Sequence, residues 1–439
     1  MNNLYNTHVT LSKYIHIFER DNQWYAYGTW VNRIWEITPK EALIILDYLK
    51  GIPLEELYKN GNIDKKIIKS IINYFEDNCI IEEIEECENS NFDNTIDSMI
   101  LLITEKCNFA CTYCYGAYGE KNKTMIFSTA KLAIDLAKKL NIPEIVFFGG
   151  EPLLNFELIK QTVKYIKEIQ FDVDLRITTN GSLVTEEIAS FFAENNILVS
   201  VSMDGNKEQH DKTRIYKDGS SSYEQVINGI KILKEYNLLD LIEITHSSRH
   251  DEDISAQIKG GLDLFPIISC ACVDGKKGCK HYNDVISGKR LTNFYKNTLD
   301  FIENNLNESE YIFGVKELYD KICNGKTFSS PQCLCSDISS RLVISSNGDI
   351  CPCPEMTNSE YVLGNINELS LEEFYIKRNE VLNALSSRKL KKEWFSGMCE
   401  TCIQHVTKKD GFFFYENPLD FEKCIEDLLI LYVKKNRMQ

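Results

Sequence analysis

Three cysteines stand close together in the first third of the chain with the spacing C-x3-C-x2-C: Cys107, Cys111 and Cys114. They follow directly after an apolar, strand-like stretch at 99–104. Thiolates are the soft ligands of iron–sulfur clusters, and a four-iron cluster usually takes one ligand at each iron. Three cysteines would therefore leave one iron open to a substrate. The same spacing also allows a zinc site or three buried thiols.

Polar motifs follow three later strand-like stretches. They are Phe148-Gly149-Gly150-Glu151-Pro152, then Thr178-Thr179-Asn180-Gly181, and then Ser202-Met203-Asp204-Gly205, the last followed by His210-Asp211 and Arg214. The paired glycines let backbone approach a ligand closely. In α/β sheets and barrels the ligand lies at the carboxyl ends of the parallel strands, so one site could gather all these motifs.

In this order, one motif per strand, the features resemble the radical S-adenosylmethionine (SAM) enzymes over residues 98–270. The resemblance implies that the cluster on the three cysteines, which are the catalytic residues, binds the amino and carboxylate groups of SAM at its open iron. An electron from the cluster would split SAM into methionine and a 5′-deoxyadenosyl radical. The implied SAM contacts are Tyr113 near adenine; Gly149, Gly150, Glu151 and Pro152 at the methionine amino group; Asn180, Ser202 and Arg214 at the ribose and carboxylate, with Thr179 and Asp204 in the same motifs. Arginine suits a carboxylate because its planar guanidinium can form paired hydrogen bonds.

The last third of the chain carries a second set of cysteines. Two pairs of ligands brought together by a hairpin and a later loop can surround one metal or cluster. The pattern resembles the SPASM extension of radical SAM enzymes, or its shorter form, twitch, and implies an auxiliary [4Fe-4S] cluster on Cys335, Cys353, Cys399 and Cys402. A structural zinc site is the alternative. The longer form would add further cysteines after the pair, but position 408 is Lys. A second auxiliary cluster therefore stays open, with candidate ligands Cys323, Cys333, Cys351, Cys424 and His405.

Other cysteines have no assigned partner. Cys270 and Cys272 end the sixth strand-like stretch, 266–272, and strand alternation sends both to the same side. Facing the mouth of a barrel, they could touch substrate or bind metal with Cys279, or they could fill space as small hydrophobic side chains. Cys79 and Cys87 are expected to be inert.

Strands and helices alternate between residues 98 and 272, which predicts a parallel sheet with helices outside it. The expected strands are 99–104, 144–148, 174–178, 198–203, 241–245 and 266–272, and the expected helices include 129–140, 156–169, 185–195 and 223–236. Together with the resemblance, this pattern predicts an α/β fold whose centre is a partial (β/α)6 barrel. The radical SAM core is expected at 98–310 and the SPASM/twitch domain at 311–439.

The first part of the chain predicts a small separate unit at 1–84, followed by an acidic linker at 85–97. Paired strands are expected between 13 and 37, a helix from Pro39 after the N-cap Thr38, a helix at 65–78 and a closing strand at Ile80-Ile81. The unit resembles the winged-helix-like, PqqD-like precursor-recognition domain of peptide-modifying enzymes, which capture a leader segment by strand addition. A packed helper domain and a DNA-binding winged helix are the alternatives.

Composition limits the choice of partners. The chain has 439 residues, a net charge of -16 and 16 cysteines. We find no signal peptide and no apolar run of membrane-spanning length, so a cytoplasmic protein without a membrane partner is expected. Grouped thiols in a reducing compartment favour metal sites. The acidic charge argues against nonspecific nucleic-acid binding.

The succession of recognition unit, SAM barrel and auxiliary cluster resembles maturases of ribosomally made peptides, of the sactipeptide and ranthipeptide type. The resemblance implies an enzyme that forms an intramolecular crosslink, most simply a Cys thioether, with a reductant such as flavodoxin or ferredoxin. The auxiliary cluster would take up the surplus electron or hold the thiol. Carbon–carbon crosslinking, epimerisation and sulfatase-maturase-like oxidation of a protein Cys or Ser stay open. From a different class, so does an iron–sulfur electron carrier or regulator.

Overall fold

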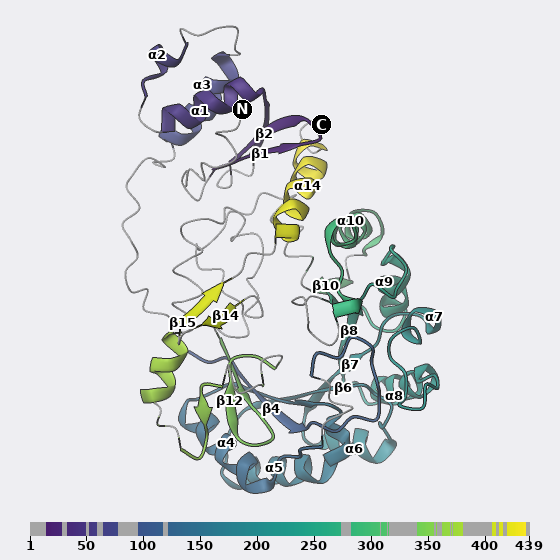
Figure 1. Cartoon of the computed structure of the whole chain (residues 1–439). Helices are drawn as coiled ribbons and strands as arrows, with labels where there is room; N and C mark the ends of the chain where they lie inside the picture. Colours follow the sequence, from purple (N-terminus) through teal and green to yellow (C-terminus); the bar gives the residue numbers. More distant parts are fainter. Residues whose placement is uncertain are drawn as a thin grey trace.

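The computed structural model describes residues 15–28, 33–49, 52–58, 65–77, 95–116, 122–273, 282–307, 309–313, 315, 340–354, 357, 362–368, 370, 372–380, 406–409, 412–415 and 419–435. Their elements run from a small N-terminal unit to a large curved sheet with helices outside it, and then to a C-terminal helix that returns to the N-terminal unit (Figure 1).

Six parallel strands form the middle of the large sheet: β4 (Ser98–Thr104), β5 (Glu144–Gly149), β6 (Asp174–Thr179), β7 (Ile197–Ser202), β8 (Leu239–His246) and β9 (Ile267–Cys272). Each strand pairs with the next one in sequence order, so their carboxyl ends lie at one edge. The expected α/β fold with a partial (β/α)6 barrel is thereby confirmed.

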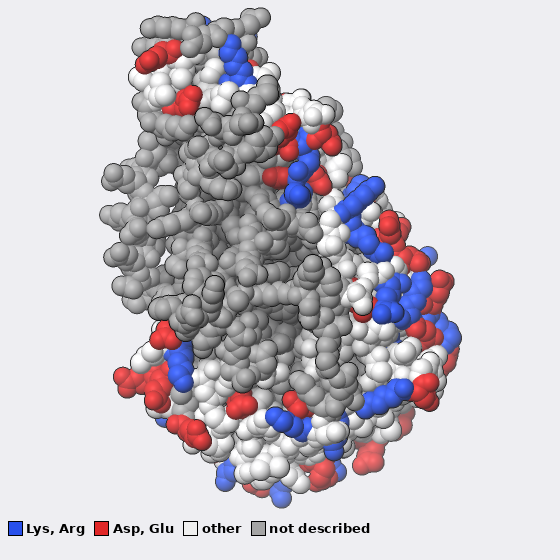
Figure 2. All heavy atoms as spheres, viewed as in Figure 1, with Lys and Arg blue, Asp and Glu red and all other residues white. Residues whose placement is uncertain are grey.

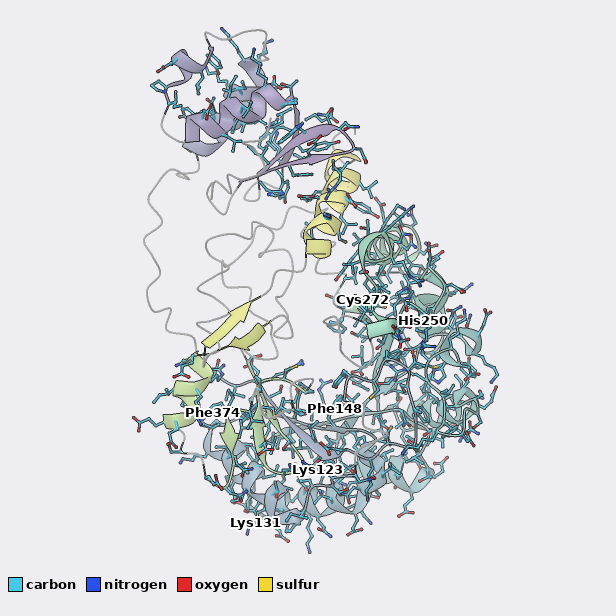
Figure 3. All side chains as sticks on the ribbon, viewed as in Figure 1. Lys123, Lys131, Phe148, His250, Cys272 and Phe374 are labelled. Carbon is cyan, nitrogen blue, oxygen red and sulfur yellow. The ribbon has the colours of Figure 1, made fainter. Side chains whose placement is uncertain are left out.

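Helices line the outside of this curved sheet (Figure 1): α4 (Phe127–Lys139), α5 (Phe156–Glu168), α6 (Glu186–Glu194), α7 (Lys207–His210), α8 (Tyr223–Glu235), α9 (Ser255–Leu262) and α10 (Gly288–Asn305). Strand alternation sends Phe147 into the core beneath the helices and Phe148 into a second apolar cluster with Ile100 and Leu102. Figure 3 shows Phe148 inside the curve and Lys131 outside it. The barrel is therefore packed on both faces of its first strands, as parallel sheets usually are.

The first C-terminal hairpin continues the barrel sheet. Strand β11 (Arg341–Ile344) lies parallel to β4, and β12 (Asp349–Cys351) returns antiparallel to β11 and pairs with β13 (Gly364–Asn365). The turn between β11 and β12 has Gly348 at φ +87, a backbone conformation that favours glycine. At the other end of the sheet, β10 (Tyr311–Phe313) lies parallel to β9.

The N-terminal unit has three antiparallel strands, β1 (Ile15–Arg20), β2 (Gln23–Gly28) and β3 (Arg33–Ile37), followed by α1 (Pro39–Leu49), α2 (Leu54–Leu57) and α3 (Lys65–Asp77). The predicted cap is present: the backbone N–H of Glu41 donates to Thr38 Oγ1 at 3.2 Å, and the N–H of Thr38 donates to the Glu41 carboxylate at 2.7 Å. This reciprocal pair is a capping box. The predicted strand at Ile80-Ile81 lies outside the described residues, and the expected domain ranges stay predictions.

The C-terminal helix α14 (Leu419–Lys435) lies between the N-terminal sheet and α10. Its buried side chains Cys424 and Leu428 share a core with Phe18 and Tyr25 of the sheet. A small hairpin, β14 (Val406–Lys409) and β15 (Phe412–Tyr415), precedes it. The helix thus connects the two ends of the chain.

Charges are mixed on the visible surface. On the face shown in Figure 2, basic side chains of the described residues lie among acidic ones instead of gathering into one basic field. The described residues also include no helix that is long and apolar enough to cross a membrane.

Candidate active site

The cysteine loop lies at the carboxyl edge of the barrel, directly after β4. Its backbone pairs with a distant segment: Ala110 N–H donates to the Ile215 carbonyl at 2.8 Å, and Thr112 N–H donates to the Thr213 carbonyl at 3.0 Å. Arg214 therefore lies next to the cysteine loop because of main-chain hydrogen bonds, although about a hundred residues separate them in sequence.

The three thiols share one environment. Burial raises the pKa of Cys107 to about 11 and of Cys111 to about 12, and each of these thiols also interacts electrostatically with Cys114. No three His, Cys, Asp or Glu side chains of the described residues converge tightly enough to hold a single metal ion. A zinc ion would require that convergence, with Zn–S bonds of about 2.3 Å, whereas a four-iron cluster spreads its thiolates around a larger body.

The two glycines after β5 make room for backbone. A Cβ atom on Gly149 would lie 2.3 Å from the carbonyl oxygen of Thr104, and one on Gly150 would lie 2.3 Å from that of Lys106. Gly150 N–H and Glu151 N–H donate to these same carbonyls, both at 2.8 Å. The glycines therefore let the end of β5 join the start of the cysteine loop, and this contact explains their lack of a side chain.

Glu151 is fully buried and fixes the ends of two strands together. Its carboxylate accepts hydrogen bonds from the Thr179 hydroxyl at 2.6 Å, from Asn180 N–H at 2.8 Å and from Leu153 N–H at 3.0 Å. Burial outweighs these donors and raises the pKa of Glu151 to about 7. The predicted residues Glu151, Thr179 and Asn180 are thus brought together, with the carboxylate turned toward the protein.

A closed ring of hydrogen bonds ties the cysteine loop to the end of β6. Asn180 Nδ2 donates to Asn108 Oδ1 at 2.8 Å, Asn108 Nδ2 donates to Ser182 Oγ at 2.9 Å, and Ser182 Oγ donates to Asn180 Oδ1 at 2.7 Å. Sequence analysis missed Asn108 and Ser182. Their positions, inside the cysteine run and directly after the Thr-Thr-Asn-Gly motif, were the available signal.

Asp204 is the centre of a buried polar cluster at the end of β7. Its carboxylate accepts hydrogen bonds from Tyr113 Oη at 2.6 Å, Thr213 Oγ1 at 2.9 Å and Thr245 N–H at 3.0 Å. Burial alone would raise the pKa of Asp204, but Arg214 and the neighbouring histidines keep it below its usual value. Asp204 therefore stays ionised and accepts three hydrogen bonds from donors of the protein itself.

Arg214, one of the expected SAM contacts, is a buried arginine beside Asp204. Its side chain is 9% exposed, and its guanidinium lies over the Tyr113 ring at 5.4 Å. Nε lies 3.1 Å from Asp204 Oδ2, yet its N–H does not point at an acceptor among the described residues. A buried guanidinium with its charge balanced but its hydrogen bonding incomplete can accept a carboxylate ligand at low cost. Electrostatic contact with Cys111 places it beside the cysteine loop.

Ser202 lies nearby on β7 and donates to Glu243 Oε2 of β8 at 3.3 Å. Burial raises the pKa of Glu243 above its ordinary value, even though Arg214 lies close enough to oppose the shift. Glu243 was not predicted from the sequence, since a single Glu in a strand pattern carries no motif.

Of the two alternatives left open for Cys270 and Cys272, the structure does not support the one in which they face the barrel mouth. Cys270 is in register with Ile244, and Cys272 with His246. Ile244 lies beneath helix α9, where a Cβ atom on Gly261 would come within 2.8 Å of its Cδ1 atom. Both cysteines share the expected side, but it is the side covered by helices, and Cys270 belongs to the core. Figure 3 shows Cys272 near His250 at the same end of the barrel.

The candidate ligands of auxiliary clusters are only partly described. Cys353 follows β12 and is buried, whereas Cys335, Cys399 and Cys402 lie outside the described residues. Cys351 lies in the inner apolar cluster with Leu102 and Val343, and its thiol lies 3.7 Å from the Asp349 carbonyl. Cys424 is buried on α14. The other candidate ligands, Cys323, Cys333 and His405, lie outside the described residues, and so do Cys279 and the two cysteines expected to be inert, Cys79 and Cys87.

Two family models match the chain. The radical SAM superfamily matches residues 101–247, a range that contains the three-cysteine loop and all the expected SAM contacts through Arg214. An iron–sulfur cluster-binding domain, SPASM, matches residues 335–403, which begins at Cys335 and includes Cys402.

Curated relatives include enzymes that modify proteins or peptides. A cysteine-type anaerobic sulfatase-maturating enzyme of Clostridium novyi is 27% identical over 306 residues, 64% of this chain and 79% of that protein. The radical SAM cyclopropyl synthase TigE of Paramaledivibacter caminithermalis is 29% identical over 263 residues, 52% and 55% of the two chains. An uncharacterised protein of Methanocaldococcus jannaschii is 43% identical over 143 residues. The chain spans about half the length of the last two relatives, 55% and 49%.

Solved structures share the fold. The structure of anSMEcpe with bound AdoMet and the peptide Cp18Cys has a TM-score of 0.64 at 23% identity, covering 78% of this chain and 97% of that chain. Streptococcus suis SuiB bound to its precursor peptide SuiA has a TM-score of 0.57 at 16% identity, covering 93% and 99%. The chain therefore carries a radical SAM domain, which binds SAM and a [4Fe-4S] cluster, and a SPASM domain, which binds an auxiliary iron–sulfur cluster.

Proposed function

We propose that this radical SAM enzyme modifies a ribosomally made precursor peptide in the cytoplasm and forms an intramolecular crosslink in it, a thioether from a peptide cysteine. When bound, SAM and the cluster supply a 5′-deoxyadenosyl radical that can remove hydrogen from an unactivated carbon. The observation that carries the proposal is the buried Arg214 guanidinium beside the three-cysteine loop, whose Nε–H bond is directed at no acceptor among the described residues.

The residues around Arg214 divide the work of holding SAM. Arg214 binds its carboxylate, while the ion pair with Asp204 and the packing against the Tyr113 ring keep the guanidinium in place. Ser202 and Glu243, which are joined by a hydrogen bond on the inner side of β7 and β8, are suited to ribose hydroxyls. Fixed placement matters for such chemistry, because a loosely held radical would react with any nearby C–H group.

The N-terminal unit supports a peptide substrate. Strand addition to a small sheet captures an extended segment mainly through backbone hydrogen bonds. The SuiB fold covers 93% of this chain, whereas the anSMEcpe fold covers 78%. The SuiB fold therefore matches more of the chain outside the barrel. Helix α14 connects the unit to α10 of the barrel, which would keep a bound leader at a constant distance from the barrel edge.

The proposed thioether requires a defined loss of hydrogen. The peptide carbon gives up one hydrogen atom to the radical, the cysteine thiol gives up a proton, and one electron leaves as the C–S bond forms. The auxiliary cluster, for which we propose Cys335, Cys353, Cys399 and Cys402 as ligands, is the acceptor available for that electron. Flavodoxin or ferredoxin would supply the electron that starts the reaction.

A precursor encoded beside the gene gives the test. The holoenzyme, reconstituted anaerobically with SAM and dithionite, should make the peptide lighter by two hydrogens for each crosslink and protect the same number of cysteines from iodoacetamide. A precursor with those cysteines changed to serine is the matched control and should keep its mass. Release of 5′-deoxyadenosine without either change in the peptide would rule out thioether formation.

A sulfatase-maturase-like oxidation of Cys or Ser is the second candidate, because the Clostridium novyi relative aligns over 79% of its length. Oxidising such a side chain to an aldehyde creates a group that reacts with hydrazide reagents, which a thioether does not. Hydrazide labelling of the product separates the two reactions. An iron–sulfur electron carrier or regulator, the alternative that is not a radical SAM enzyme, would release no 5′-deoxyadenosine.

A further inference from the structure

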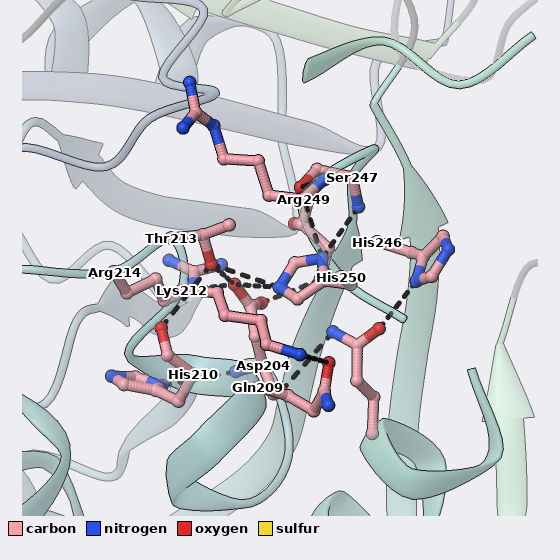
Figure 4. Close-up of polar contacts among 12 residues, drawn as sticks. Asp204, Gln209, His210, Lys212, Thr213, Arg214, His246, Ser247, Arg249 and His250 are labelled. Carbon is pink, nitrogen blue, oxygen red and sulfur yellow. Dashed lines mark hydrogen bonds and ion pairs between the residues drawn. The ribbon is translucent and has the colours of Figure 1, made fainter. Parts of the chain in front are cut away.

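Two buried histidines flank the Asp204–Arg214 pair. His210 follows the Asp204 turn in α7, and His250 lies in the segment between β8 and α9. Figure 4 shows the His250 ring within the polar cluster, joined to Ser247 and Thr213, and the His210 ring at the edge of the cluster around Asp204. His250 lies beyond the radical SAM match, which ends at residue 247. No sequence motif pointed to it.

The backbone fixes the tautomer of each ring. Ser247 N–H donates to His250 Nδ1 at 2.9 Å, and Asp204 N–H donates to His210 Nδ1 at 3.3 Å. A ring nitrogen that accepts from an amide cannot carry a proton, so both rings hold their proton at Nε2.

Each Nε2 proton then orients one hydroxyl group. His250 Nε2 lies 3.2 Å from Thr213 Oγ1, and that hydroxyl donates to Asp204 Oδ2 at 2.9 Å. His210 Nε2 lies 2.9 Å from Ser222 Oγ, which donates to the Arg214 carbonyl at 2.6 Å. His250 is thus linked through the Thr213 hydroxyl to the Asp204 carboxylate. His210 is linked through the Ser222 hydroxyl to the backbone carbonyl of Arg214.

Both histidines stay uncharged near neutral pH. Burial lowers the pKa of His210 and of His250 to about 4, although Asp204 opposes the shift in both. A neutral ring at His250 leaves Asp204 ionised without giving it a second full positive charge, so Arg214 remains its cationic partner among the described residues.

The three hydrogen bonds that Asp204 already accepts have a consequence for Arg214. Carboxylates and guanidinium groups readily form two parallel hydrogen bonds, which would consume the donors that a ligand needs. Here the Tyr113 hydroxyl, the Thr213 hydroxyl and the Thr245 amide already occupy the carboxylate. The pair keeps its charge attraction, while the Arg214 Nε–H bond, although Nε lies 3.1 Å from Asp204 Oδ2, is not directed at an acceptor among the described residues.

We propose that His250 is a positioning residue: it orients the Thr213 hydroxyl toward Asp204, which keeps Asp204 from forming a paired hydrogen bond with Arg214 and leaves the guanidinium ready for the SAM carboxylate. The inference depends on the proposed SAM-binding role of Arg214, and it does not involve the peptide. His250 itself touches neither SAM nor the cluster.

The test measures SAM binding to the reconstituted holoenzyme by equilibrium dialysis, without peptide or reductant. Thr213→Val and His250→Leu should each raise the dissociation constant about tenfold, whereas Thr213→Ser and His250→Gln, which keep a donor, should stay within about threefold of wild type. The double variant Thr213→Val/His250→Leu should bind no more weakly than either single variant, because both remove the same interaction.

Iron content and melting temperature are measured in the same samples, and they should not follow the dissociation constant. Wild-type affinity in both Thr213→Val and His250→Leu would overturn the proposal, and so would fully additive losses in the double variant. If Thr213→Val and His250→Leu do not fold, the conservative variants Thr213→Ser and His250→Gln provide the test. A loss of SAM affinity beyond about threefold in Thr213→Ser contradicts the positioning of the hydroxyl. A wild-type holoenzyme that binds no SAM would instead refute the role of Arg214, and a failure of the peptide reaction would leave the inference intact.

Discussion

At the scale of single residues, burial sets the protonation of the groups around the cysteine loop. The pKa values of Cys107 and Cys111 lie at about 11 and about 12 because burial disfavours their thiolates. Cluster binding requires thiolates, so assembly of the cluster must release protons that the protein alone would retain. The neighbouring histidines are held neutral by the same burial.

The neutral histidines predict a loss of stability in acid. An ordinary histidine pKa of 6.5 falls to about 4 for His250 in the folded chain, so the unfolded chain binds the proton more tightly. The contribution of neutral His250 to the free energy of unfolding is complete above pH about 6.5. It falls by about 2–3 kcal/mol as the pH falls toward about 4. Urea unfolding of wild type and His250→Gln at several pH values measures the difference.

The difference between the two proteins is the informative quantity, because Glu151, whose pKa is raised to about 7, changes stability in the opposite sense over the same range. Stability curves that stay parallel for wild type and His250→Gln down to pH about 4 would contradict a neutral His250.

The hydrogen-bonded ring predicts a role for Asn108 in holding the cysteine loop. Asn108→Ala removes the hydrogen bond that Asn108 donates to Ser182 and the one that it accepts from Asn180. The substitution should lower the free energy of unfolding by about 1–3 kcal/mol. The loop should also lose iron to a chelator several times faster than wild type. Asn297→Ala removes a single long contact to the Glu252 carbonyl and is the matched control. Equal iron loss in both variants would show that the ring does not hold the loop.

At the scale of elements, regular periodicity was enough to locate most strands and helices of the barrel, whereas the barrel itself was predicted with the help of the family resemblance. The expected strands and helices between 99 and 236 agree with the observed ones within a few residues, because apolar residues recur at strand or helix spacing, as Ala130, Ala133, Ile134 and Ala137 do in α4. Helix α9 was missed. Its sequence, Ser-Ala-Gln-Ile-Lys-Gly-Gly-Leu, is short and holds two glycines, which weaken a helix on its own.

Those glycines are explained by packing. A Cβ atom on Gly260 would lie 2.5 Å from Asn206 N and 2.8 Å from Gly205 C, so α9 contacts the turn that carries Asp204. Gly260→Ala should force α9 away from this turn and cost several kcal/mol, despite the better helix propensity of alanine. A fall in melting temperature together with weaker SAM binding is the expected result, and Lys259→Ala, one position earlier and exposed, is the control. A stabilised Gly260→Ala protein would contradict this packing.

The sequence pattern of a strand does not tell which of its two faces is covered by helices. Alternation correctly placed Cys270 and Cys272 on one side of β9, but it gives no information about which side helices cover. That depended on Ile244 and Gly261, which reach the strand from other parts of the chain. Similarly, Arg214 and Asp204 could be proposed from motifs, whereas His250 and Glu243 act through contacts that no local pattern contains.

At the scale of the whole molecule, α14 fastens the N-terminal unit to the barrel. Arg20 of β1 forms ion pairs with Glu426 and, at 3.0 Å, with Asp427, while His16 Nε2 lies 2.8 Å from Glu426. On its other side, Tyr432 donates to Asp300 of α10 at 2.7 Å. The contacts of His16 and Arg20 with α14 join residues some 400 positions apart, and for that reason they could not be predicted from local sequence patterns.

The contacts between α14 and the N-terminal unit predict that capture of the peptide and cleavage of SAM can be separated. Arg20→Glu places a third acid beside Glu426 and Asp427 and should cost about 2–5 kcal/mol of docking free energy. Hydrogen exchange of β1–β3 should then accelerate, and peptide modification should fall, while peptide-independent SAM cleavage stays near wild type. The charge swap Arg20→Glu/Glu426→Arg should recover part of the protection. Unchanged exchange in Arg20→Glu would show that α14 does not fasten the unit.

The most direct measurement of the central claim is anaerobic release of 5′-deoxyadenosine by the holoenzyme with SAM and dithionite, in wild type and in the Cys107→Ala/Cys111→Ala/Cys114→Ala variant. We expect release from wild type and none from the variant, which should still retain the iron of its auxiliary cluster. Release by the triple variant, or none from a wild type that holds its full iron, would contradict a SAM-binding cluster on these three cysteines.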